Sequence, residues 1–279
     1  MESHNIGLLH RAARRSRTWL RYTRNRVWHK LSGGRGVPFR VAPGWWVKVH
    51  PRAYDDLMYW CRYEQATLNV LTRIWHDSWC ILDVGAHVGS FSVSCLRGGQ
   101  NNIRMVAVEP SPTAADMLEL NLQTHNRHSW QIERVAIGDK AGNVELYQGP
   151  QEMFTAAPRN VPDASGLPVT VPMETLDHLC HRLKFRPELI KVDVEGFEAE
   201  VLCGANYVLD VIRPTLLLEW HREMLENRGI NSLAALQPLH KRGYFLQPYE
   251  FPNVQPLSPL HYDDLPQTDI VRLLCLPLF

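Results

Sequence analysis

Short apolar runs recur along the chain from residue 80 onward, and segments of helical periodicity separate most of them. The runs read CILDV, RMVAV, WQIERVAI, ELIKVDV, TLLLEW, YFLQPY and DIVRLLCL. Runs of this length that alternate with helices are typical of a parallel sheet covered by helices on both faces. The last two runs are joined by a Pro-rich loop, residues 248–266, without a helix. The pattern therefore predicts an α/β protein whose last two strands pair antiparallel at one edge of the sheet.

Two further elements are predicted before the first strand of this sheet. Residues 37–52, VPFRVAPGWWVKVHPR, have turn signals between β-forming residues, which indicates a short antiparallel hairpin. Residues 63–76, YEQATLNVLTRIWH, place apolar side chains at helical spacing. We expect an amphipathic helix there that leads directly into the strand.

Charge is distributed unevenly along the 279 residues. Residues 1–54 contain 12 of the 30 Lys and Arg residues and a single acid, Glu2. We expect a basic extension at 1–39, followed by one catalytic domain at 40–279 with its cofactor-binding core at about 63–221. The segment from Arg11 to Lys30 interleaves basic and aromatic residues, which suits contact with an anionic membrane or with phosphate groups. A solvated, loosely ordered lead-in is the more common alternative at a terminus.

The cysteines and the lack of long apolar runs bear on the compartment. Six cysteines are spread through the chain, without the close pairs of a zinc site or the dense spacing of a disulfide scaffold. No apolar run approaches the roughly 18 residues that span a bilayer. The start of the chain also lacks the apolar stretch of a secretory signal. These observations predict a soluble, cytoplasmic protein.

The first strand of the sheet leads into a Gly-rich turn, DVGAHVG. Gly85 permits a turn with positive φ, and Gly89 allows the following helix to approach the strand closely. Backbone N–H groups at the start of that helix favour an anionic ligand group. A dinucleotide site would need G-x-G-x-x-G, so the turn favours a carboxylate over a pyrophosphate. Asp83 would receive a positively charged group of the same ligand.

Two further strand ends complete the candidate cofactor site. Glu109 ends the second strand, where a carboxylate can accept hydrogen bonds from both hydroxyls of a ribose. The third strand is predicted to run through VAI, with the backbone of Ala136 beside an adenine. Ligands of open α/β sheets bind beyond the carboxyl ends of the strands, and all three segments end at that edge. The predicted cofactor-binding residues are Asp83, Gly85, Ala86, His87, Gly89, Glu109, Pro110 and Ala136.

Acidic residues also end the fourth and fifth strands. Asp193 and Glu195 follow one run, and Glu219 and His221 end the next. An acid or His at this edge is suited to act as a general base, so these four residues are the catalytic candidates. Each also has a structural alternative, because acids near a helix start and polar groups near loops are common.

Three neighbouring assignments are weaker. Glu198 is expected mainly to occupy the first turn of a helix. Lys191 is expected to point to the opposite face of its strand as a packing or surface residue. Asp193, Glu195, Glu219 and His221 would also suit a divalent cation such as magnesium or calcium. The sequence does not decide this alternative, and no metal is predicted.

The ordered motifs DVGAHVGSFS, AVEPSP, LNLQTHN, VAIGD, ETLDHL, IKVDVEGFEAEVLCGA and LLLEWH resemble the FkbM family of S-adenosylmethionine-dependent methyltransferases. The resemblance covers roughly residues 63–221, and IKVDVEGFE is its most specific part. It implies a Rossmann-like class I methyltransferase fold with a seven-stranded, mostly parallel sheet and an antiparallel edge strand. It also implies O-methylation of a hydroxyl on a sugar, glycolipid or polyketide-like small molecule.

By matching position, the resemblance places Asp83, Gly85 and Gly89 at the methionine portion of S-adenosylmethionine and Glu109 at its ribose. His87 stands where the family more often has Asn, so a ligand contact and a helix cap both remain open for that side chain. The acceptor pocket would be formed by the hairpin, the segment 148–170 and the loop 248–266. The segment 148–170 is expected to act as a lid.

Other function classes fit the sequence less well. A nicotinamide-dependent oxidoreductase is disfavoured because G-x-G-x-x-G is missing. A nucleic-acid methyltransferase would use the basic extension on phosphates. The chain lacks the Asn/Asp-Pro-Pro-aromatic motif and a paired-cysteine nucleophile, so no nucleic-acid partner is expected. A non-catalytic methyltransferase-like binding module is the third alternative. The identity of the acceptor and the oligomeric state are not encoded in these motifs.

Overall fold

The structure is a computed structural model. It describes residues 23–28, 30–33, 36–42, 45–49, 66–74, 79–98, 102–123, 125, 128–148, 154–155, 168–249 and 268–278. Most of the basic segment 11–30, most of the segment 148–170 and the loop from 250 to 266 lie outside these residues. Among the described helices, none has the length and apolar character that a bilayer span requires.

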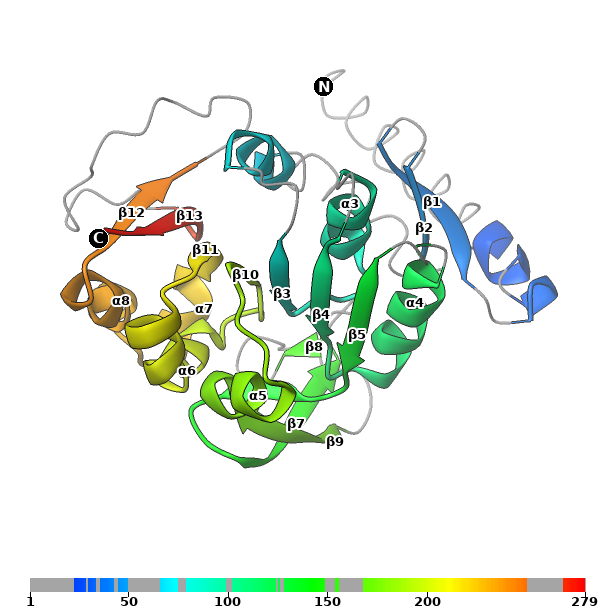
Figure 1. The fold of residues 1–279 in the computed structure, drawn as a ribbon. Coiled ribbons are helices and arrows are strands. Elements are labelled where there is room, and N and C mark those ends of the chain that lie inside the picture. Colours follow the sequence, from blue (N-terminus) through cyan, green and yellow to red (C-terminus); the bar gives the residue numbers. More distant parts are fainter. Residues whose placement is uncertain are drawn as a thin grey trace, which may run out of the picture.

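A seven-stranded sheet forms the centre of the molecule (Figure 1), in the order β12-β13-β11-β10-β3-β4-β5. Its strands are β3 (Cys80–Val84), β4 (Arg104–Val108), β5 (Ser129–Glu133), β10 (Leu189–Val192), β11 (Thr215–His221), β12 (Tyr244–Pro248) and β13 (Ile270–Pro277). Adjacent strands from β5 to β11 pair in parallel, whereas β13 is antiparallel to both β11 and β12. The predicted fold class and the antiparallel pairing of the last two runs are confirmed.

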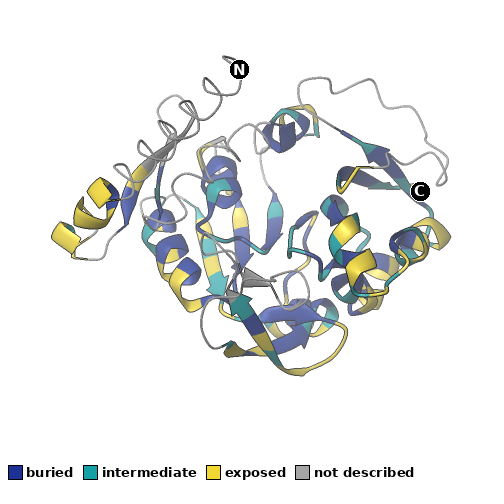
Figure 2. Cartoon of the chain, turned by 180° about the vertical axis from the view of Figure 1, so that it is seen from behind, coloured by how far each residue is buried: buried dark blue, intermediate teal, exposed yellow. Residues whose placement is uncertain are grey.

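Each face of this sheet supports a separate apolar core, because successive side chains of a strand point to opposite faces. In β3, Leu82 packs into one core and Ile81 into the other. Helices α3 (Ser90–Gly98) and α4 (Pro112–Leu122) cover one face together with the helix at residues 66–74. The central strands are accordingly buried, whereas the outer helix surfaces are exposed (Figure 2).

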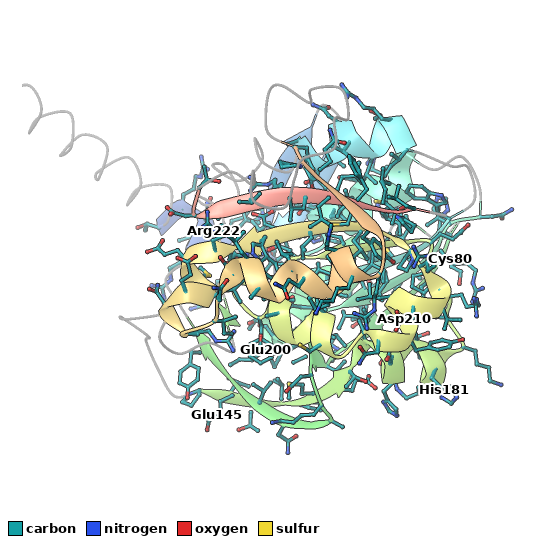
Figure 3. The ribbon with its side chains drawn as sticks, turned by 90° about the vertical axis from the view of Figure 1, so that its left-hand side faces the viewer. Cys80, Glu145, His181, Glu200, Asp210 and Arg222 are labelled. Atoms are coloured by element: carbon teal, nitrogen blue, oxygen red, sulfur yellow. The ribbon has the colours of Figure 1, made fainter. Side chains whose placement is uncertain are left out.

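The other face is covered by α5 (Leu176–Leu183), α6 (Glu198–Cys203), α8 (Ser232–Lys241) and the π-helix η3 (Val208–Ile212). The short helix α7 (Arg222–Asn227) follows β11 directly. Figure 3 looks toward the β12 edge of the sheet, where α8 packs beside β12. Helices therefore lie on both faces, as predicted.

A second, smaller sheet corrects one prediction. It has the order β6-β9-β7-β8, formed by β6 (Ala136–Gly138), β9 (Val169–Thr175), β7 (Gly142–Gln148) and β8 (Phe154–Thr155). The run WQIERVAI is therefore not one strand, and Ala136 does not end the third strand of the main sheet. Arg134 turns back onto α4, where it binds Asp116 at 2.8 Å and Glu119 at 3.0 Å. The chain then pairs β6 in parallel with β9.

The predicted hairpin and helix before the sheet are both present. β1 (Val37–Ala42) pairs antiparallel with β2 (Trp45–Val49), and residues 66–74 are helical. Asn121 of α4 anchors the hairpin. Its side chain accepts a hydrogen bond from the backbone N–H of Lys48 at 2.6 Å and donates to the Lys48 carbonyl at 2.9 Å. It also donates to the carbonyl of Val88 at 2.7 Å, so one amide joins the hairpin, α4 and the Gly-rich turn.

We expect Asn121→Ala to lower the free energy of unfolding by about 2–4 kcal/mol, because buried backbone groups left without partners cost about 1–3 kcal/mol each. Urea unfolding followed by circular dichroism measures the change. Asn227→Ala, at an exposed residue of α7, is the control and should change stability by no more than about 0.5 kcal/mol. Equal effects of the two substitutions would show that the amide is not an anchor.

Candidate cofactor and acceptor site

The Gly-rich turn lies between β3 and α3 and is packed against the end of β10. The N–H groups of Gly85 and Ala86 both donate to the carbonyl of Val108 at 3.0 Å. Gly85 has a φ of 81°, and a Cβ atom there would fall 1.8 Å from the carbonyl oxygen of Asp193. Only glycine fits such an approach. At Gly89, with a φ of 88°, a Cβ atom would meet the side chain of Leu118.

Glu109 joins this turn to the end of β4. Its carboxylate accepts hydrogen bonds from the N–H of His87 and the N–H of Ser111, both at 2.8 Å. Burial raises the pKa of Glu109 to about 7, although the two N–H donors favour the charged form. Pro110 directly follows, and Ser111 then caps α4. Glu109 therefore lies at the predicted strand end, and it also fixes the turn.

Asp83 is fully buried at the end of β3. One carboxylate oxygen accepts a hydrogen bond from the Ser92 hydroxyl at 2.6 Å, and the other has no hydrogen-bond partner among the described residues. Burial raises the pKa of Asp83, against the attraction of Lys191. An orphaned buried carboxylate oxygen is costly unless a ligand donates to it.

His87 has a left-handed backbone with a φ of 50°. His is among the residue types enriched at positive φ, so this backbone conformation is compatible with a histidine. Burial lowers the pKa of His87 to about 4, so its ring is neutral at neutral pH. Its contribution to the turn shown here is its backbone N–H.

Lys191 corrects a second prediction. Residues two apart on a strand share a face, so Lys191 lies on the same side as Asp193 and not opposite to it. Its ammonium group donates to Asp193 at 2.9 Å and is almost fully buried. Burial alone would raise the pKa of Asp193, but Lys191 and His221 lower it below its ordinary value.

His221, at the end of β11, is held between two carboxylates. Its Nδ1 lies 2.8 Å from Glu198, and its Nε2 lies 3.5 Å from Glu195. Burial would lower the pKa of His221, but Glu198 and Glu195 raise it well above its ordinary value. The two carboxylates therefore favour the protonated form of the ring.

Glu195 lies in the turn between β10 and α6, and Glu198 is the first residue of α6. Glu195 has a φ of 52°, and burial raises its pKa to about 7 while His221 acts in the opposite direction. Glu198 is fully buried and accepts a hydrogen bond from the N–H of Gly196 at 3.0 Å in addition to its bond with His221. Glu198 thus positions the ring of His221 as well as beginning a helix.

Glu219 is paired across the sheet with Arg272, its neighbour in the register of β11 and β13. The guanidinium donates to Glu219 at 2.7 Å, and both side chains are largely buried. Burial raises the pKa of Glu219, and Arg272 opposes that shift. Asp193, Glu219 and His221 each place one potential ligand atom within 4.8 Å of the others.

Comparisons with known proteins identify the family of the chain. A family model described as the methyltransferase FkbM domain matches residues 83–246, which is more than half of the chain. The chain belongs to the FkbM methyltransferase family. Its strand order, with the reversed strand next to the edge, is that of the class I methyltransferase fold expected for such a domain. A search among curated proteins finds no match.

Several solved structures resemble this FkbM chain at low identity. A methyltransferase FkbM from Methylobacillus flagellatus is 15% identical, with 72% of this chain and 44% of that chain covered and a TM-score of 0.47. An S-adenosylmethionine-dependent O-methyltransferase from Thermotoga maritima is 10% identical, with 77% and 65% covered and a TM-score of 0.43. An rRNA methylase from Streptococcus thermophilus is 11% identical, with 76% and 95% covered and a TM-score of 0.44. This chain spans less than half the length of the Methylobacillus protein.

Within the FkbM domain, the described structure brings most of the predicted site residues to the carboxyl edge of the sheet. Ala136 instead lies in the second sheet, where it pairs with Met173. The two buried cations, Lys191 and Arg272, were not among the predicted site residues. Both are lone basic residues inside an otherwise apolar run, and that pattern was the available signal. A charge at such a position is stable only with a partner.

We expect Gly85→Ala to lower the free energy of unfolding by roughly 3 kcal/mol or more. A left-handed alanine costs about 1–2 kcal/mol, and displacing the backbone of Asp193 adds to it. Gly229→Ala is a matched control, because Gly229 has a φ of 80° with no atom within 4 Å of its added Cβ. Chemical unfolding of both variants isolates the steric contribution. Similar losses in both would mean that Gly85 is required for its dihedral angle alone.

Proposed function

We propose that the chain is an S-adenosylmethionine-dependent O-methyltransferase that acts on a hydroxyl of a sugar, glycolipid or polyketide-like small molecule. The observation that carries the proposal is the contact between the two halves of the site. Gly85 approaches the backbone of Asp193 so closely that no side chain fits, and the N–H of Asp193 donates to Val84 at 3.0 Å. A cofactor held by the Gly-rich turn would therefore lie beside the acidic cluster.

The residues present fit the chemistry of this cofactor. The orphaned oxygen of Asp83 offers an acceptor for the ammonium of the methionine portion, directly or through water. Backbone N–H groups at the start of α3 would bind its carboxylate, and Glu109 offers an acceptor for the ribose hydroxyls. When bound, the cofactor supplies an activated methyl group on a sulfonium centre for in-line transfer.

The acidic cluster would orient the acceptor hydroxyl and remove its proton. Asp193 and Glu219 are each tied to a permanent cation, Lys191 or Arg272, whereas His221 is held by Glu198. Glu195 lies 3.5 Å from Nε2 of His221, and its pKa, which burial raises to about 7, suits proton transfer at neutral pH. We assign Glu195 as the general base, with Asp193, Glu219 and His221 orienting the hydroxyl. Correct placement of the acceptor would supply a large part of the rate enhancement.

Cofactor affinity should depend on the ionisation of Glu109. Its pKa is about 7, and the charged form is the better acceptor for hydroxyl groups, so S-adenosylmethionine should bind roughly tenfold more tightly at about pH 8 than at about pH 6. Isothermal titration calorimetry measures the dissociation constant. Glu109→Gln should bind weakly and lose this contribution while keeping any pH dependence of the ligand itself. Identical pH profiles for the wild type and Glu109→Gln would show that Glu109 does not bind the ribose.

Turnover should depend on Glu195. We expect Glu195→Gln to lower kcat by about 100- to 10,000-fold without weakening S-adenosylmethionine, because a general base contributes about this factor. Transfer from methyl-labelled cofactor to sugars, glycolipids, polyketides and RNA provides the assay. Glu223→Gln, at an exposed residue of α7, is the control and should retain full activity.

The same assay separates the alternatives. Labelling of RNA alone would favour a nucleic-acid methyltransferase. Cofactor binding by the wild type without transfer to any acceptor would favour a non-catalytic module. Failure of the folded protein to bind the cofactor would overturn the proposal.

A further inference from the structure

We propose that Asp193, Glu219 and His221 form a binding site for one small divalent cation of the Mn²⁺ class. One potential ligand atom from each residue lies within 4.8 Å of the other two. The three residues come from the adjacent strand ends of β10 and β11, so the main sheet fixes their spacing. Two carboxylates and one imidazole provide the mixed oxygen and nitrogen donors of a first-row divalent ion.

The hydrogen bonds of these three residues leave one atom of each available. Among the described residues, Asp193 uses one oxygen for Lys191 and Glu219 uses one oxygen for Arg272. His221 uses Nδ1 for Glu198. Metal ligands are commonly held by such second partners, and a carboxylate on the far nitrogen of a histidine is a frequent arrangement.

The Nε2 atom of His221 is a second observation that indicates a bound ligand, separate from the grouping of the carboxylates. The side chain is only 2% exposed, and Nε2 has no hydrogen bond within the described part of the chain. Its nearest charged neighbour there is Glu195, whose carboxylate lies 3.5 Å away. A buried ring nitrogen without a hydrogen bond is costly, and coordination to a metal ion would satisfy it.

The net formal charge of the cluster also favours a divalent cation. Four carboxylates, those of Asp193, Glu195, Glu198 and Glu219, gather around two permanently charged side chains, Lys191 and Arg272. If the ring of His221 is neutral, the four carboxylates exceed the two cations by two negative charges. One divalent ion would compensate them, and the ring would release any proton on Nε2 when that nitrogen coordinates.

The consequence for the acceptor rests on the proposed function. A cation between β10 and β11 would lie beside Glu195, where the acceptor hydroxyl is proposed to bind. Cations lower the pKa of a coordinated hydroxyl and can hold two neighbouring oxygen atoms at once. The site would therefore favour acceptors with two adjacent hydroxyl groups, as in sugars.

Mn²⁺ titration of chelator-treated protein tests the site directly, with electron paramagnetic resonance reporting the free ion. We expect one bound Mn²⁺ per chain, at least tenfold weaker binding by Glu219→Gln and Asp193→Asn, and no change in Glu223→Gln. Ca²⁺ should compete poorly, because it prefers six to eight oxygen ligands. Paramagnetic broadening of the His221 ring signals in the wild type gives a readout that does not depend on a variant folding.

Two outcomes would overturn the site: no Mn²⁺ bound by the folded wild type, or binding that is unchanged by Glu219→Gln and leaves the His221 signals sharp. S-adenosylmethionine affinity is measured on the same samples. Cofactor binding without Mn²⁺ binding would reject the metal site and leave the methyltransferase proposal standing. Mn²⁺ binding without cofactor binding would support the metal site and overturn the methyltransferase proposal.

Discussion

The close approach of Gly85 to the backbone of Asp193 sets the geometry on which the rest of the site depends. A Cβ atom at Gly85 would fall 1.8 Å from the Asp193 carbonyl oxygen, so the first and fourth strand ends touch without an intervening side chain. The turn that is suited to the cofactor and the cluster that is suited to the acceptor are thereby held at a fixed separation. Methyl transfer requires such a constraint, because the reacting atoms must meet in line.

Burial of opposite charges is the second organising feature. Lys191 and Arg272 lie within apolar strands of the sheet, and each reaches a carboxylate at the carboxyl edge. A buried ion pair stabilises a fold only weakly, but loss of one partner leaves a costly isolated charge. Lys191 and Arg272 therefore favour the charged forms of Asp193 and Glu219 and orient the two carboxylates in a region that excludes much of the solvent.

Most of the fold was predictable from the chain because its strands are buried on both faces, which produces nearly continuous apolar runs. The break between β5 and β6 was not, since it accompanies the pairing of Ala136 in β6 with Met173 in β9, a contact between residues distant in sequence. Hydrophobic periodicity carries no information about such a contact. The division at residues 39 and 40 and the roles of the extension stay predictions.

The sequence indicated the positions of the acidic residues of the candidate site better than those of its buried basic residues. Strand ends located Asp83, Glu109 and Asp193, because parallel strands deliver their last residues to one edge. Lys191 was assigned to the wrong face, although strand alternation places it on the side of Asp193. The pKa shift of His221 could not be foreseen, since it depends on neighbours distant in sequence. Only the folded chain brings Glu198 to His221.

The side chain of Asn121 has a further consequence for the hairpin. Lys48 faces Pro38, which has no N–H, and Asn121 binds the N–H and the carbonyl of Lys48 in the way that a neighbouring strand would. An open strand edge is a template for pairing with other chains. Because Asn121 occupies these two groups of Lys48, they are not available to pair with a strand of another chain.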